Sequence, residues 1–149
     1  MAPSPYIFGT GPVPGGQIFR EHHMRVEMVP VQSGATINKG DAILMTPTGA
    51  VSGTQALVNS TPGKAGVALM ASTATVPGVP AGYIRAIFGG FVGVNKTAVI
   101  IYYGEPVGFS STAGQVQVTT EATLYEYLIG YAMEGAISTD TSIGIQLAE

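Results

Sequence analysis

The chain has 149 residues, a formal net charge of -3 at pH 7, and 10% charged residues, against roughly 25% in an ordinary soluble domain. It has no cysteine, which excludes disulfides, thiolate metal ligands and a cysteine nucleophile. Its six basic residues are scattered without a run, so the sequence predicts no nucleic-acid-binding surface. No stretch is long and apolar enough for a membrane-spanning helix, and we expect no membrane partner.

The low charge is the most informative bulk property. A free monomer normally needs many charged side chains to stay soluble. The sequence therefore favours a surface that is partly buried against other chains, or one that is neutral and polar through Ser, Thr and Gln. The N-terminus has no basic region followed by an apolar core, so we expect synthesis and action without export.

Residues 1–24 are predicted to form an extended N-terminal arm, because they are rich in Pro and Gly. The arm has two apolar clusters, Tyr6, Ile7, Phe8 and Ile18, Phe19. We expect these clusters to bind a partner surface, although a floppy terminus is the alternative. His22 and His23 follow, and adjacent side chains on an extended chain point to opposite sides. We therefore expect no metal site there.

The remaining residues, 25–149, are predicted to form one all-β domain. Turn residues recur every eight to twelve positions, and no helical period is sustained. A small β-barrel or sandwich is the expected architecture. A helical turn is plausible only at 121–127, and 50–59 is a weak strand or loop. The expected strands are 25–31, 42–46, 65–70, 83–94, 97–103, 107–110, 115–120, 128–133 and 143–147.

Two landmarks repeat at one offset within this domain. Gly40-Asp41 returns as Gly104-Glu105, and Gly66 returns as Gly130, each 64 residues later. Two landmarks that share an offset predict two copies of one β unit, roughly 37–94 and 101–149.

The candidate chemistry is sparse. Asp41 and Glu105 follow glycine in a predicted turn, where a carboxylate usually accepts hydrogen bonds from backbone N–H groups. A structural role is favoured over an intersubunit contact or acid–base chemistry. The only histidines lie beside the arm, so a Ser-His-Asp site is not expected. The sequence predicts no enzyme, no catalytic residue, no cofactor and no metal. Five tyrosines could either form a surface on which a sugar stacks or simply pack in the core and interfaces. They are Tyr102, Tyr103, Tyr125, Tyr127 and Tyr131.

The ordered set of these features resembles a known family. In order they are Lys39 to Ile43, Lys64 to Ala68, Ile84 to Val94, Gly104 to Val107, Ile129 to Ala132 and Ile143 to Leu147. Over roughly residues 30–149 the chain is similar to the capsid cement, or head decoration, proteins of tailed bacteriophages. Two segments depart from that pattern, the long arm at 1–24 and the Pro-rich loop at 72–82.

The resemblance implies a β-clip-like or small-barrel fold of two related β units without enzymatic activity. It also implies a homotrimer that binds the major capsid protein on the outer surface of an expanded head. The protein would be made in the host cytoplasm and would reside on the virion. Another virion or tail subunit, or a soluble carbohydrate-binding β module, are the alternatives.

Overall fold

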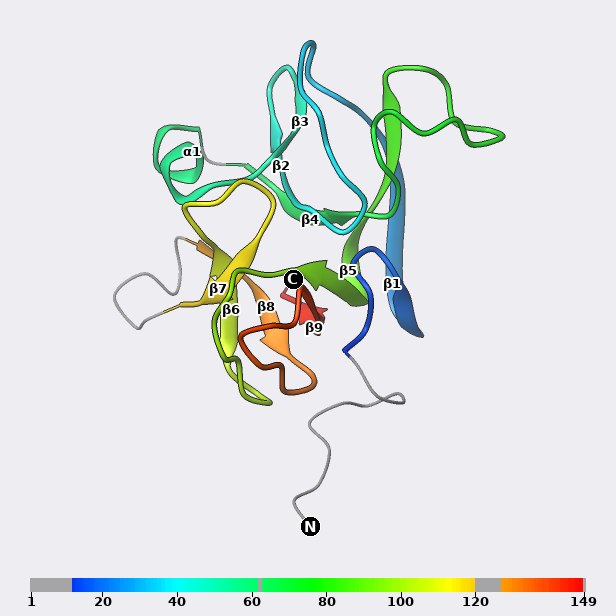
Figure 1. Cartoon of the computed structure of the whole chain (residues 1–149). Helices are drawn as coiled ribbons and strands as arrows, with labels where there is room; N and C mark the ends of the chain where they lie inside the picture. Colours follow the sequence, from blue (N-terminus) through cyan, green and yellow to red (C-terminus); the bar gives the residue numbers. More distant parts are fainter. Residues whose placement is uncertain (1–11, 62, 120–126, 149) are drawn as a thin grey trace.

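The computed structural model describes residues 12–61, 63–119 and 127–148. These residues form a curled antiparallel sheet with the shape of a half-barrel (Figure 1). The predicted all-β class is confirmed. The described residues contain one short helix, α1 (Gln55–Ser60), and nine strands. The strands are β1 (Ile18–Pro30), β2 (Ala42–Thr46), β3 (Gly49–Ser52), β4 (Ala65–Ala68), β5 (Tyr83–Asn95), β6 (Pro106–Phe109), β7 (Val116–Val118), β8 (Leu128–Ala132) and β9 (Ser142–Leu147).

The strand order shows that the body is built from two related units. Along the sheet the order is β3-β2-β4-β5-β9-β8-β6-β7. Read from each edge towards the centre, the first unit runs β3-β2-β4-β5 and the second runs β7-β6-β8-β9, so the strands of the two units occupy equivalent positions. The pair Ala42↔Val67 in the first unit corresponds to Pro106↔Tyr131 in the second, at the offset of 64 residues. The units join where β5 and β9 pair. The prediction of two related β units is confirmed.

The core lies partly within one unit and partly between the two. Adjacent residues of a strand point to opposite faces, yet Ile43 and Leu44 are both fully buried. Ile43 belongs to a cluster within the first unit, around Ile84 and Phe88. Leu44 belongs to the larger cluster that includes Phe109 of the second unit. Strand β2 is thus covered on both faces, and the second unit supplies part of that cover.

The predicted arm boundary at residue 24 is wrong, because residues 18–24 belong to β1. Ile18 pairs with Val92, and Arg20 pairs with Phe91. The pairing is irregular between Arg20 and Arg25, where His23 has a φ of 51°. The strand continues beyond this irregularity because Val26 to Pro30 pair again with β5 in regular register. The dense Pro and Gly signal in fact ends at Gly16.

Two other predictions are corrected. The β-rich run 97–103 forms no strand; it makes one isolated bridge, Ile101↔Ala136. High β propensity does not by itself produce a strand there, because the neighbouring loop pairs with this run at one residue only. The segment predicted as a weak strand or loop forms β3 and then α1, whose first turn is capped by Thr54 Oγ1 accepting from Leu57 N at 3.1 Å. In the predicted helical turn, residues 121–126 lie outside the described residues.

Candidate functional site

The repeated Gly-acid turns have the same hydrogen bonds. Asp41 Oδ2 accepts from Asn38 N at 2.9 Å, and Glu105 Oε1 accepts from Tyr102 N at 2.7 Å. The preceding glycines both have positive φ, 88° at Gly40 and 86° at Gly104. Each turn is held to the end of β4 or β8: the glycine N–H donates to Ala68 O or Ala132 O, both at 2.8 Å. Both carboxylates therefore hold backbone in place.

Asp41 makes further hydrogen bonds beyond the one that it shares with Glu105. Its Oδ2 also accepts from Ser52 Oγ at 2.7 Å, and its Oδ1 accepts from Asn95 Nδ2 at 3.1 Å. Asp41 is buried, and Gly114 of the second unit lies directly against it. The carboxylate therefore links the turn, β3, the end of β5 and the neighbouring unit. Such full use in structural bonds leaves it poorly suited to acid–base chemistry.

A third acid turn was not recognised in the sequence. Ile137 N donates to Asp140 Oδ2 at 2.9 Å, and Asp140 N donates to Ile137 O at 3.1 Å. This turn has no glycine, so it lacks the feature that identified the other two. The buried Lys96 closes it, because its Nζ donates to Ile137 O at 3.0 Å and Asp140 O at 3.1 Å. Burial lowers the pKa of Lys96, and the nearby Asp140 partly opposes that effect.

The predicted arm residues divide into two groups. Tyr6, Ile7 and Phe8 lie outside the described residues. Ile18 packs against the main core, and the Phe19 ring meets the Phe91 ring edge-on, with centroids 5.8 Å apart. Ile18 and Phe19 therefore contact the body of their own chain and do not project from it. Their predicted role toward a partner is not supported by this placement.

Residues 12–17, which we call the strap, lie across the body before β1 begins and are held there by hydrogen bonds. Val13 N donates to Glu134 Oε2 at 2.7 Å, and Gly144 N donates to the same oxygen at 2.7 Å. Gly16 N donates to Gly93 O at 2.7 Å. Gly93 makes room for the strap, since a Cβ there would lie 1.9 Å from Pro14 O. No local pattern in the sequence predicts that Glu134, only 1% exposed, holds this segment.

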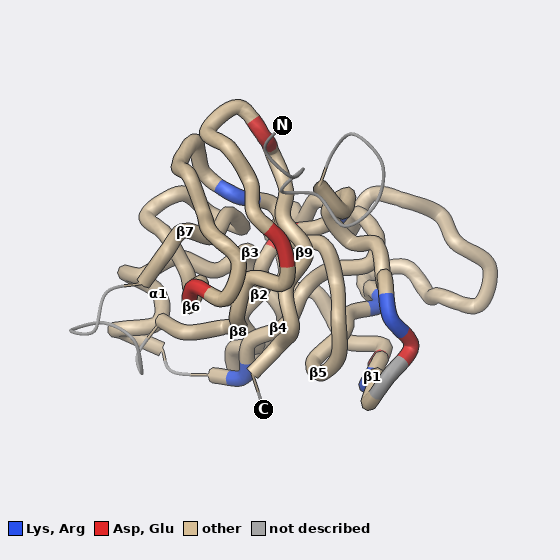
Figure 2. Tube along the Cα trace, turned by 90° about the horizontal axis from the view of Figure 1, so that it is seen from below, with Lys and Arg blue, Asp and Glu red and all other residues tan. Residues whose placement is uncertain are grey.

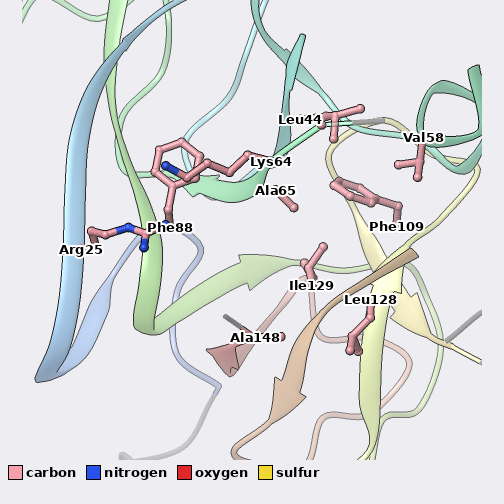
Figure 3. Close-up of a pocket in the computed structure, with 11 residues that line it drawn as sticks. Arg25, Leu44, Val58, Lys64, Ala65, Phe88, Phe109, Leu128, Ile129 and Ala148 are labelled. Atoms are coloured by element: carbon pink, nitrogen blue, oxygen red, sulfur yellow. The ribbon is translucent and has the colours of Figure 1, made fainter. Parts of the chain in front are cut away.

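A cleft of about 390 Å³ lies between the two units (Figure 3). Its apolar lining comes from both, with Leu44 and Phe88 from the first unit and Phe109 and Ile129 from the second. Lys64 lies over the Phe88 ring, 4.1 Å from its centroid. Among the described residues that line it, Arg25 and Lys64 carry charge, and none has a carboxylate, imidazole or hydroxyl group.

The rim of this cleft has an ion pair. Lys64 Nζ donates to Glu27 Oε2, and this hydrogen bond lowers the pKa of Glu27. Both side chains are nearly half exposed, so the pair contributes little to stability. Lys64 is thus already engaged on the surface of its own chain.

Most of the exposed large apolar side chains in the described residues fall into two groups, and Tyr83 and Tyr131 lie outside them. The β1 stripe consists of Met24, Val26 and Met28, at alternate positions of an edge strand. The loop patch consists of Ile100, Tyr102, Tyr103 and Ile137, whose exposed fractions are 51%, 66%, 69% and 48%. The bridge Ile101↔Ala136 joins the two loops that form the patch. Exposed apolar patches of this kind typically mark contact surfaces.

Charged residues do not form a binding surface of one sign. Figure 2 shows them few and separated, with both signs present on β1. In the described part of the chain, no group of three or more His, Asp or Glu side chains could hold a metal ion. Within the same residues, no helix has the length and apolar character to span a membrane. Of the five tyrosines considered for a platform, Tyr102, Tyr103 and Tyr131 are exposed and Tyr127 is buried; Tyr125 lies outside the described residues.

The geometry thus defines a duplicated all-β body whose acids hold turns and whose exposed apolar groups are its clearest surface features. Comparison of the sequence with models of protein families and with curated proteins found no match.

Proposed function

We propose that this protein is a structural decoration, or cement, subunit of a tailed-bacteriophage head. It would act as a non-enzymatic homotrimer that binds the major capsid protein on the outer surface of the expanded shell. The observation that carries the proposal is the combination of a charge-poor β body with exposed apolar side chains. Met28 in the β1 stripe and Tyr102 in the loop patch represent the two surfaces available to other chains. The ordered sequence features that resemble decoration proteins support the same assignment.

The mechanism would be thermodynamic linkage. A subunit that binds only the expanded shell stabilises that state by mass action. Repetition over a lattice, together with trimer formation, multiplies a modest contact energy through avidity. Because the chain has no cysteine, its contacts would depend on apolar burial and on strand addition to sheet edges. Tyr6, Ile7 and Phe8 remain the residues of the N-terminal segment proposed to bind the shell.

The test is binding to empty expanded heads. We expect the purified protein to bind them and to raise the temperature at which they disrupt. Deletion of residues 1–11 should weaken binding at least tenfold, a loss of about 1.4 kcal/mol per subunit, while the strap and body stay intact. A variant with Ala2→Ser and Ser4→Ala serves as the control. Equal affinity of the deletion variant and the intact protein would contradict the role of the segment, and absence of any binding to heads would contradict the function.

A carbohydrate-binding module is the second candidate, because Tyr102 and Tyr103 expose adjacent aromatic rings. Aromatic rings on a surface can stack on sugar faces. This candidate predicts a monomer in sedimentation experiments, binding to a glycan array, and loss of binding in Tyr102→Ala. A tail subunit would instead sediment as rings or tubes. A trimer that binds heads and no glycan would exclude both.

A further inference from the structure

We propose that the apolar cluster Tyr6-Ile7-Phe8 packs against the loop patch of its own subunit when the protein is free in solution. The inference concerns the unbound chain and does not depend on the proposed function. It commits to one occupant for the patch, a segment of the same chain. Three observations lead to it: the form of the patch, the point at which the described chain begins, and the length of chain between the two.

The two loops that carry the loop patch are joined by backbone hydrogen bonds between buried residues. Ile101 N donates to Ala136 O at 2.9 Å, and Ala136 N donates to Ile101 O at 2.8 Å. Both supporting side chains are buried. In an antiparallel pair the neighbouring positions face the other side, which brings Ile100 opposite Ile137. The result is adjacent apolar side chains that face outward from two fastened loops.

The charged groups nearest to the patch in sequence make hydrogen bonds within their own turns. The carboxylates nearest in sequence, Glu105 and Asp140, accept hydrogen bonds from the backbone N–H groups of Tyr102 and Ile137. Lys96 is buried beneath the second of these turns. An apolar ligand without charge is therefore the chemistry that the patch fits, and Tyr6-Ile7-Phe8 is an uncharged sequence of this kind.

The described part of the chain begins at this end of the molecule. Val13 is bonded to Glu134, which precedes Ile137 by three residues. Pro12 lines one surface hollow together with Thr139 and Asp140. Figure 1 shows the strap beginning near the loop that contains residues 133–141, at the end of the half-barrel away from α1.

The connecting chain is long enough. Phe8 precedes Val13 by five residues, which span up to about 17 Å when extended. Glu134 and Ile137 are three residues apart, at most about 11 Å. The segment can therefore reach the patch with chain to spare. Gly9 and Gly11 lie within the connection and permit a change of direction.

Docking would have a clear consequence for solubility and for binding. An exposed aromatic cluster and an exposed apolar patch are each prone to association, and each would cover the other. Another chain could then engage residues 6–8 only by displacing them from the patch. The free subunit would thereby keep this apolar cluster shielded until a competing surface is present.

Limited digestion with chymotrypsin tests the inference on the full-length protein. The rate of cleavage after Tyr6 and Phe8 is measured by mass spectrometry at several protein concentrations. We expect Tyr102→Ser with Ile137→Ser to raise this rate about tenfold. The control is Met24→Ser with Met28→Ser, which removes two side chains of similar exposure from the β1 stripe and should leave the rate unchanged. Cleavage after buried Phe109 is followed to check that each variant stays folded.

A reciprocal change sharpens the result. Ile7→Ser should raise the rate by the same factor, and combining it with the patch variant should give no further increase, because both remove one interaction. Equal rates in the intact protein and the patch variant would overturn the proposal. Protection that disappears on dilution would also overturn it, because the occupant would then be the segment of a second copy.

Discussion

The two units use the same turn in different surroundings. In the first unit the Gly40-Asp41 turn lies under the strap and against the second unit, and Asp41 is buried. In the second unit the Gly104-Glu105 turn lies at the loop end, and Glu105 is only partly buried. The local hydrogen bonds are equivalent. A sequence repeat therefore specifies a local conformation, whereas the energetic importance of each copy depends on what the rest of the chain places against it.

The glycines of the two turns should give the largest contrast. Gly40 and Gly104 share nearly the same φ, so an alanine incurs similar backbone strain at either position, about 1 kcal/mol. A Cβ at Gly40 would lie 2.6 Å from Gly15 Cα, whereas one at Gly104 would meet nothing within 4 Å. We expect Gly40→Ala to lower the free energy of unfolding by about 3 kcal/mol and Gly104→Ala by about 1 kcal/mol. Urea denaturation measures both, and equal losses would show that the strap yields to the added methyl group.

The acids should differ by a smaller margin. Asp41→Ala leaves Asn38 N–H, Ser52 O–H and the Asn95 amide without their shared acceptor, at a cost of about 3 kcal/mol. Glu105→Ala removes one bond at a partly exposed turn, at a cost of about 1 kcal/mol.

Urea denaturation of the two variants checks this ordering. Asp41→Asn is the matched control, because it keeps an oxygen acceptor and similar size; it should lose less than Asp41→Ala. If Glu105→Ala were as destabilising as Asp41→Ala, the difference in surroundings would have no energetic importance.

Lys96 tests the third turn, which belongs to the second unit alone. Lys96→Met removes two hydrogen bonds to the carbonyls of residues 137 and 140 and should lower the free energy of unfolding by about 1 to 2 kcal/mol at neutral pH. The folded-state pKa of Lys96 lies below its usual value of 10.5. Between those two values the unfolded chain binds more protons, so the stability of the intact protein should rise with pH.

The pH series provides the check for Lys96. Urea midpoints measured as the pH approaches 10.5 should rise in the intact protein relative to Lys96→Met. Lys39→Met removes an exposed lysine and should keep the rise seen in the intact protein. A Lys96→Met variant with the same pH dependence as the intact protein would contradict the assignment.

Several features could be read from the residues because they depend on local chemistry. The positive φ of Gly40 and Gly104 and the backbone bonds of Asp41 and Glu105 follow from a Gly-acid turn. The long strand β5 follows from its apolar composition. The run 97–103 has similar composition but has no partner strand, so propensity gave the wrong answer there. Asp140 was missed because its turn contains no glycine.

The N-terminal residues show the limit of such reasoning. Pro and Gly at 12–16 predict an extended chain, but the strap turns at Gly15 and Gly16, where Gln17 N donates to Pro14 O at 3.2 Å. Its destination depends on Glu134 and Gly93, residues distant in sequence. Ile18 and Phe19 were grouped with an arm, although β5 of the same chain covers them. Composition describes what a segment can do, and long-range packing decides where it lies.

The sequence by itself determined the all-β class, the duplication and the scarcity of charge, because strand pattern, turn chemistry and composition are local properties. Only the tertiary structure decided that Asp41 lies at the junction of the units while Glu105 does not. It also decided that the strap is fastened to the body, and that Ile100, Tyr102, Tyr103 and Ile137 form one patch. Those outcomes depend on contacts between residues far apart in the chain, and no local pattern contains them.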